Sequence, residues 1–131
     1  MLFKECTCCN RRWLTRLEFL TDPNLKLVGY QVNFEVLELG YFLFNHDSCG
    51  STIAIHADLF QDLYSGPVFK VRKTHTSDCN AHCLHQNDLE PCPALCECAY
   101  VREILQVVRN WPKAGIQSME TTRPLQIGNL L

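Results

Sequence analysis

The nine cysteines of this 131-residue chain fall into separate groups, and their placement limits the folds and functions open to it. They are Cys6, Cys8, Cys9, Cys49, Cys79, Cys83, Cys92, Cys96 and Cys98. An even number in an exported domain would indicate disulfides, but the number is odd. The first twenty residues also lack the apolar stretch and cleavage site of an export signal. Metal ligation is the favoured interpretation, with disulfides and free thiols as alternatives.

The first group of cysteines combines with a later turn to offer four metal ligands. Cys6 and Cys9 form a C-x2-C pair in which Cys8 is an alternative ligand, and His46 and Cys49 form an H-x2-C pair between two predicted strands. Two ligands three residues apart around a tight turn point the same way. The pattern resembles the knuckles of zinc ribbons and of rubredoxin, in which two ligand turns on β-hairpins clamp one metal ion.

The chemistry of this first set favours zinc. Mixed nitrogen and sulfur ligation is typical of Zn²⁺ rather than of a single iron ion. The alternative interpretation is that His46 is simply a polar turn residue and that Cys49 is a small buried apolar side chain.

Five cysteines within twenty residues form a second candidate site. Cys79 and Cys83 form one C-x3-C pair, and Cys92 and Cys96 form another. On a helix, residues four apart project from one face, so two such pairs can make a four-thiolate site. The N-terminus of a helix predicted from Pro93 would stabilise the thiolate of Cys92. Cys98 lies on a different face of that helix and is predicted to be a packed thiol.

Other interpretations of the second group stay open. His82 and His85 could replace a cysteine, and an iron–sulfur cluster would also use thiolates, although the usual C-x2-C-x2-C run is absent. The twin C-x3-C pairs also resemble the helical hairpins of mitochondrial intermembrane-space proteins. That resemblance implies disulfides joining Cys79 to Cys96 and Cys83 to Cys92.

Hydrophobic periodicity predicts an α+β fold. The helices are expected at residues 10–21, 57–64 and 93–111, and the strands at residues 27–36, 41–44, 51–55 and 68–72. The result is a small antiparallel sheet of three or four strands with zinc-ribbon-like knuckles, a short N-terminal helix and a longer C-terminal helix. Residues 1–113 are predicted to form a single metal-stabilised domain, and residues 114–131 a flexible or partner-docking tail.

Composition narrows the function. The net charge of −2 makes nucleic-acid binding a poor expectation, and no apolar stretch is long enough to span a membrane. The motifs of nucleotide-binding, acyl-transfer and zincin enzymes are missing from the sequence. We therefore expect a cytoplasmic zinc-binding protein with two structural metal ions, which acts as an interaction or regulatory module without catalysis of its own. A protein partner is expected, and the apolar residues of the tail suggest a homodimer.

Two alternatives to that function remain. A redox or electron-transfer protein would use an iron–sulfur cluster or reactive thiols in the C-terminal cysteine group. A metal-dependent hydrolase would use His46 and a carboxylate around an open metal position, in which case Cys49 would not be a ligand.

Overall fold

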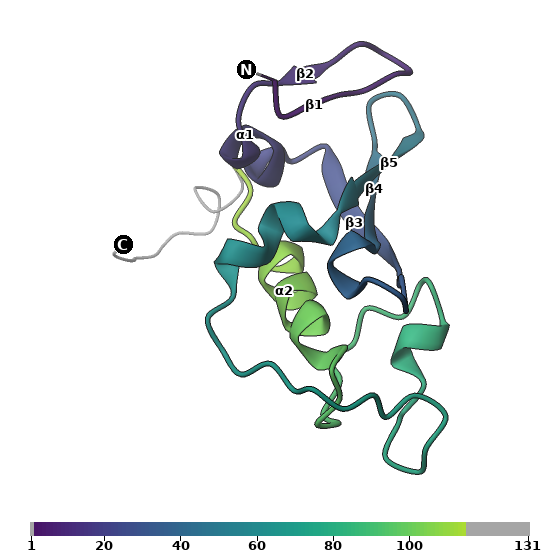
Figure 1. The fold of residues 1–131 in the computed structure, drawn as a ribbon. Coiled ribbons are helices and arrows are strands. Elements are labelled where there is room, and N and C mark those ends of the chain that lie inside the picture. The colour runs from purple at the N-terminus through teal and green to yellow at the C-terminus, as the bar shows by residue number, and fades with distance from the viewer. Residues whose placement is uncertain (1, 115–131) are drawn as a thin grey trace, which may run out of the picture.

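The structure is a computed structural model that describes residues 2–114 (Figure 1). Nearly all of the predicted tail, including the apolar residues that suggested a dimer, lies outside the described residues. The elements in chain order are β1 (Lys4–Glu5), β2 (Arg12–Trp13), α1 (Arg16–Thr21), β3 (Leu25–Gln31), η1 (Leu37–Leu39), β4 (Tyr41–His46), β5 (Ser51–His56), η2 (Ala57–Leu63), η3 (His82–Leu84) and α2 (Ala99–Arg109). No helix within the described residues is both long and apolar enough to cross a lipid bilayer.

The predicted fold class is confirmed: the chain combines small antiparallel sheets with a short first helix and a longer last one. Strands β3, β4 and β5 pair in sequence order, and β1 pairs with β2 in a separate two-stranded hairpin. Helix α2 packs against β3 and η2, as Figure 1 shows. The side chains between these elements form one continuous core that includes Trp13, Phe44 and Val101.

Strand β3 does not follow a simple alternation of buried and exposed side chains. A β-bulge between Leu27 and Gly29 shifts the pairing with β4, so Leu25 and Tyr30 are both buried although one is odd-numbered and the other even-numbered. An extra residue in one strand reverses which side chains face the core. Val28, which the period-two pattern placed in the core, is therefore exposed, and the strand ends at Gln31 instead of continuing to Val36.

Helix α1 begins later than predicted. The hydroxyl of Thr15 accepts a hydrogen bond from the backbone N–H of Glu18 at 3.1 Å, which caps the helix and sets its start at Arg16. Residues 12–13 instead pair with β1. The prediction of a helix over residues 10–21 was wrong in its first half because those residues close the β1–β2 hairpin.

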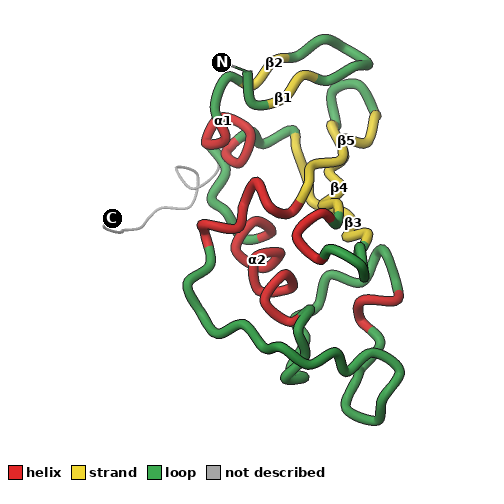
Figure 2. Tube along the Cα trace, viewed as in Figure 1, coloured by secondary structure: helices red, strands yellow, loops and turns green. Residues whose placement is uncertain are grey.

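The segment between η2 and α2 also differs from the prediction. Figure 2 shows residues 64–98 as loop apart from η3, so the fourth strand predicted at residues 68–72 is wrong. Helix α2 begins at Ala99 and not at Pro93. The segment just before α2 is held by a hydrogen bond to the long loop: the N–H of Glu97 donates to the carbonyl of Val71 at 2.9 Å. Cys92 and Cys96 therefore do not lie on a helix.

Candidate metal centre

Four side chains from two distant parts of the chain converge at one end of the sheet. The ligand atoms of Cys6, Cys9, His46 and Cys49 all lie within 4.8 Å of one another. The Sγ atoms of Cys6 and Cys49 are 3.6 Å apart, and Nδ1 of His46 lies 3.6 Å from Cys9 Sγ and 3.4 Å from Cys49 Sγ. With Zn–S bonds of about 2.3 Å, a tetrahedral ion separates two sulfurs by about 3.8 Å. The spacing of the four atoms therefore fits a single tetrahedral metal ion.

Two turns of similar geometry position these ligands. In the β1–β2 hairpin, the N–H of Asn10 donates to the carbonyl of Cys6 at 2.8 Å, and Asn10 has a left-handed φ of 65°. In the β4–β5 turn, the N–H of Gly50 donates to the carbonyl of His46 at 2.8 Å, and Gly50 has a φ of 76°. Each turn thus joins a ligand to the residue four positions later through a left-handed corner. Figure 1 shows the two hairpins at the same end of the molecule.

The hydroxyl of Ser51 lies between the two most protected sulfurs. Its Oγ is 3.0 Å from Cys49 Sγ and 3.3 Å from Cys6 Sγ. The hydrogen bond to Ser51 is the main cause that lowers the pKa of Cys6 to about 5, and the backbone N–H groups of Cys9 and Cys8 assist it. The same side chain lowers the pKa of Cys49. Both thiols are thus shifted toward the thiolate form that ligation requires.

The imidazole of His46 is buried and held in one orientation. It is 2% exposed, and it packs edge-on against Trp13 with ring centroids 5.2 Å apart. Nε2 lies 2.9 Å from the hydroxyl of Ser48, so Nδ1 is the nitrogen that faces the sulfurs. Burial lowers the pKa of His46, but hydrogen bonds with Cys6 and Cys49 outweigh it and raise the pKa overall. A fixed outer hydrogen bond of this kind is typical of metal-binding histidines.

Cys8 is not part of the four-atom set. It is exposed, and contact with Cys49 raises the pKa of its thiol. Cys9 is influenced in both directions: the N–H of Arg11 lowers its pKa, whereas desolvation and the neighbouring Cys6 and Cys49 thiols raise it overall. Cys9, and not Cys8, therefore joins Cys6 in the cluster.

The second group of cysteines converges only in part. Cys98 Sγ lies 3.3 Å from Cys83 Sγ and 3.3 Å from Cys96 Sγ. Cys98 is thus the central sulfur, although it was expected to be a packed thiol on a different face. Cys79 Sγ instead accepts the N–H of Ala81 at 3.3 Å. Among the described residues, the group of four predicted here does not form a compact ligand set.

The thiols of the second group have shifted pKa values. Contact with Cys98 is the main cause that lowers the pKa of Cys83 to about 6, whereas contact with Cys83 raises the pKa of Cys98. Desolvation raises the pKa of Cys92. Desolvation also opposes ionisation of Cys96, but hydrogen bonds from backbone N–H groups to its sulfur lower its pKa overall.

Sequence reasoning missed the two serines that support the first centre. Ser48 and Ser51 each follow a ligand by two residues, a spacing that could have identified them as hydrogen-bond partners of that ligand. Two other polar residues, one at the end of β5 and one in the β4–β5 turn, make ordinary contacts. His56 Nδ1 lies 2.9 Å from the carbonyl of Leu39, and Asp47 pairs with Lys26 at 3.1 Å.

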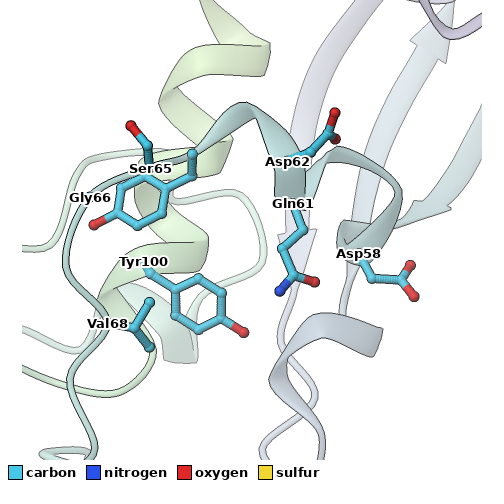
Figure 3. Close-up of a pocket in the computed structure, with 8 residues that line it drawn as sticks. Asp58, Gln61, Asp62, Ser65, Gly66, Val68 and Tyr100 are labelled. Atoms are coloured by element: carbon cyan, nitrogen blue, oxygen red, sulfur yellow. The ribbon is translucent and has the colours of Figure 1, made fainter.

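An open hollow beside η2 offers no catalytic arrangement. It measures about 520 Å³ and is lined by Asp58, Gln61, Asp62, Tyr64, Ser65, Gly66, Val68 and Tyr100. Figure 3 shows the carboxylates of Asp58 and Asp62 turned away from the Tyr100 ring, and Asp62 is paired with Arg16 at 2.5 Å. Within residues 2–114, no histidine or cysteine lines the hollow. The cysteine–histidine cluster is therefore the stronger candidate for function.

Comparison with known proteins adds no evidence on what this site does. No protein-family model matches the chain, and neither the curated proteins nor the solved structures that were compared gave a match.

Proposed function

We propose that this protein binds a structural zinc ion through Cys6, Cys9, His46 and Cys49. The single observation behind this is the convergence of three sulfurs and one imidazole nitrogen within 4.8 Å. Three thiolates and a neutral imidazole fill the four positions of a tetrahedral ion, which is typical of a closed structural site. The zinc ion would fasten the β1–β2 hairpin to the turn between β4 and β5.

The closed ligand set supports an interaction or regulatory module rather than a hydrolase. A hydrolytic zinc ion usually keeps three protein ligands and a bound water. Here the protein offers a fourth ligand, so no position is left for substrate. We propose that the zinc-stabilised surface binds a protein partner and that the protein has no catalysis of its own.

Metal analysis of two neighbouring cysteine variants tests the metal site. Protein purified without oxygen should contain zinc and show no visible absorption band, because d¹⁰ Zn²⁺ is colourless. Cys9→Ser should lose one zinc ion per chain, whereas Cys8→Ser should retain it, since only Cys9 belongs to the set. Iron with a visible band at this site would contradict the proposal, as would equal loss of zinc in both variants.

The coordination itself can be read by X-ray absorption at the zinc edge. At the first centre we expect three sulfurs at about 2.3 Å and one nitrogen at about 2.0 Å. An oxygen from water in place of a sulfur would contradict the closed site and favour the hydrolase alternative.

A further inference from the structure

A second, separate sulfur cluster lies where the long loop meets α2. The sulfurs of Cys83, Cys96 and Cys98 are all buried, with Cys98 in contact with the other two at 3.3 Å each. All three are free cysteines. Cys83 comes from η3, whereas Cys96 and Cys98 immediately precede α2, so the cluster joins two segments that are distant along the chain.

The spacing of these sulfurs does not match a disulfide. A disulfide bond is about 2.05 Å long, well below 3.3 Å. Cys98 is equally close to Cys83 and Cys96, so it has no single partner for such a bond. Sulfurs bound to one tetrahedral zinc ion lie about 3.8 Å apart. Cys83, Cys96 and Cys98 do not all lie within 4.8 Å of one another, so binding an ion would draw the sulfurs of Cys83 and Cys96 together around it.

The surroundings of the cluster suit a negative charge. Arg102 is fully buried, and its guanidinium lies 4.0 Å from Cys83 Sγ. It also donates to the carbonyls of Asp88 and Glu90. The N–H of Lys73 donates to Cys96 Sγ at 3.1 Å. Arg102 already pairs with the carboxylate of Asp88 at 3.5 Å. Its guanidinium also adds positive charge beside Cys83, which suits the net negative charge of four thiolates around Zn²⁺.

We propose that Cys83, Cys96 and Cys98, with Cys92 as the fourth ligand, bind a second zinc ion. Binding needs all four sulfurs as thiolates, so it would release to solvent the protons that the cluster still holds. The inference extends the proposed zinc-binding function but uses none of the ligands of the first centre. The second ion would hold η3 and the long loop against the start of α2.

Cys92 is a better fourth ligand than Cys79. It lies four residues before Cys96 and it is half-buried. The Cys79 sulfur accepts a hydrogen bond from the N–H of Ala81 in its own turn. The predicted ligand set for this region is therefore revised by exchanging Cys79 for Cys98.

The two contacts at Cys98 favour a single ion over a four-iron cluster. In a four-iron cluster each thiolate binds a different iron, so its ligating sulfurs lie farther apart than two ligands of one ion. Contacts of 3.3 Å at Cys98 fit sulfurs gathered around one ion.

A matched pair of variants tests this assignment. The wild-type protein should contain two zinc ions per chain, Cys98→Ser should contain one, and Cys79→Ser should keep both. Cys9→Ser should also contain one, from the second centre. If the wild type holds a single ion that Cys9→Ser removes, the second centre is wrong and the first stands. Loss of zinc in Cys79→Ser with retention in Cys98→Ser would overturn the ligand set.

A measurement on the wild-type protein covers the case in which Cys98→Ser does not fold. Native zinc-loaded protein is treated with a thiol-alkylating reagent, with and without a zinc chelator, and the modified cysteines are identified by mass spectrometry. We expect Cys79 to react at the same rate in both samples and the half-buried Cys92 to react only after chelation. Equal reactivity of Cys92 in the two samples, or iron with visible absorption in the Cys9→Ser protein, would overturn the proposal.

Discussion

Among single residues, Asp22 has an unusually large role in the core. Its Oδ2 accepts the indole N–H of the fully buried Trp13 at 2.8 Å, and its Oδ1 accepts the N–H of Asn24 at 2.8 Å. In Asp22→Ala the indole donor would stay buried without a partner, which costs about 1–3 kcal/mol. Urea unfolding should show a lower midpoint at an unchanged slope. The control is Asp58→Ala, which removes an exposed carboxylate and should change the free energy of unfolding by less than about 0.5 kcal/mol.

Tyr30 presents the opposite case, a buried hydroxyl that forms no hydrogen bond with any of the described residues. Burial raises the pKa of this phenol, and the ring lies under the guanidinium of Arg102 at 5.7 Å. Tyr30→Phe keeps the ring and removes only the unpaired polar group. We expect the free energy of unfolding to stay constant or rise by about 1 kcal/mol. A clear loss of stability in a thermal or urea unfolding curve would show that the hydroxyl has a partner after all.

The two cysteine groups show which site residues could be predicted from sequence. In the first group each pair spans one short turn, and the two turns are brought together by adjacent hairpins, so local spacing was enough to name Cys6, Cys9, His46 and Cys49. In the second group the assignment depended on the helical phase of Cys98. That helix starts at Ala99, so the argument about faces did not apply to any cysteine in the group.

Among the turns and strands, the two left-handed corners of the first centre should respond differently to substitution. A Cβ on Gly50 would meet no atom within 4 Å, so Gly50→Ala adds only the strain of its φ of 76°. That strain costs about 1–2 kcal/mol. Asn10 already has a φ of 65°, so Asn10→Gly removes strain and should have a small effect.

Thermal unfolding of the zinc-loaded variants, with zinc content measured in parallel, checks this pair. Gly50→Ala should unfold at a lower temperature with its zinc content unchanged, because the substitution touches no ligand. Equal stability of Gly50→Ala and the wild type would mean that the corner is not held in the left-handed region when metal is bound.

Regular elements were predictable where neighbours along the chain are also neighbours in space. Strands β4 and β5 form a tight hairpin, and their predicted positions agree with the structure within two residues. The β3 bulge and the missing strand at residues 68–72 depend on contacts with distant segments, which periodicity does not contain. The start of α2 is likewise set by a tertiary contact, the hydrogen bond from Glu97 to Val71.

For the protein taken together, the main consequence of the proposed metal centres is a steep dependence of stability on pH. Unfolded thiols have a pKa near 9.0 and are protonated at neutral pH, whereas zinc-bound sulfurs are not. The unfolded state therefore binds more protons, so stability rises with pH and falls on acidification. Each ligating thiol contributes about 1.4 kcal/mol per pH unit in this range. Cys6, Cys9 and Cys49 alone thus predict a loss of about 4 kcal/mol per pH unit.

Acid titration of circular dichroism and tryptophan fluorescence, run with and without zinc, measures that slope. Trp13 packs on His46, so its fluorescence reports the first centre directly. With zinc present, the folded signal should disappear cooperatively between about pH 7 and pH 4, and chelator at neutral pH should produce the same change. In Cys9→Ser, the dependence of stability on pH should be weaker by at least the contribution of the first centre. A folded signal that stays constant down to pH 4, with zinc still bound, would mean that protons do not compete with the metal for these sulfurs, and the structural metal role would be wrong.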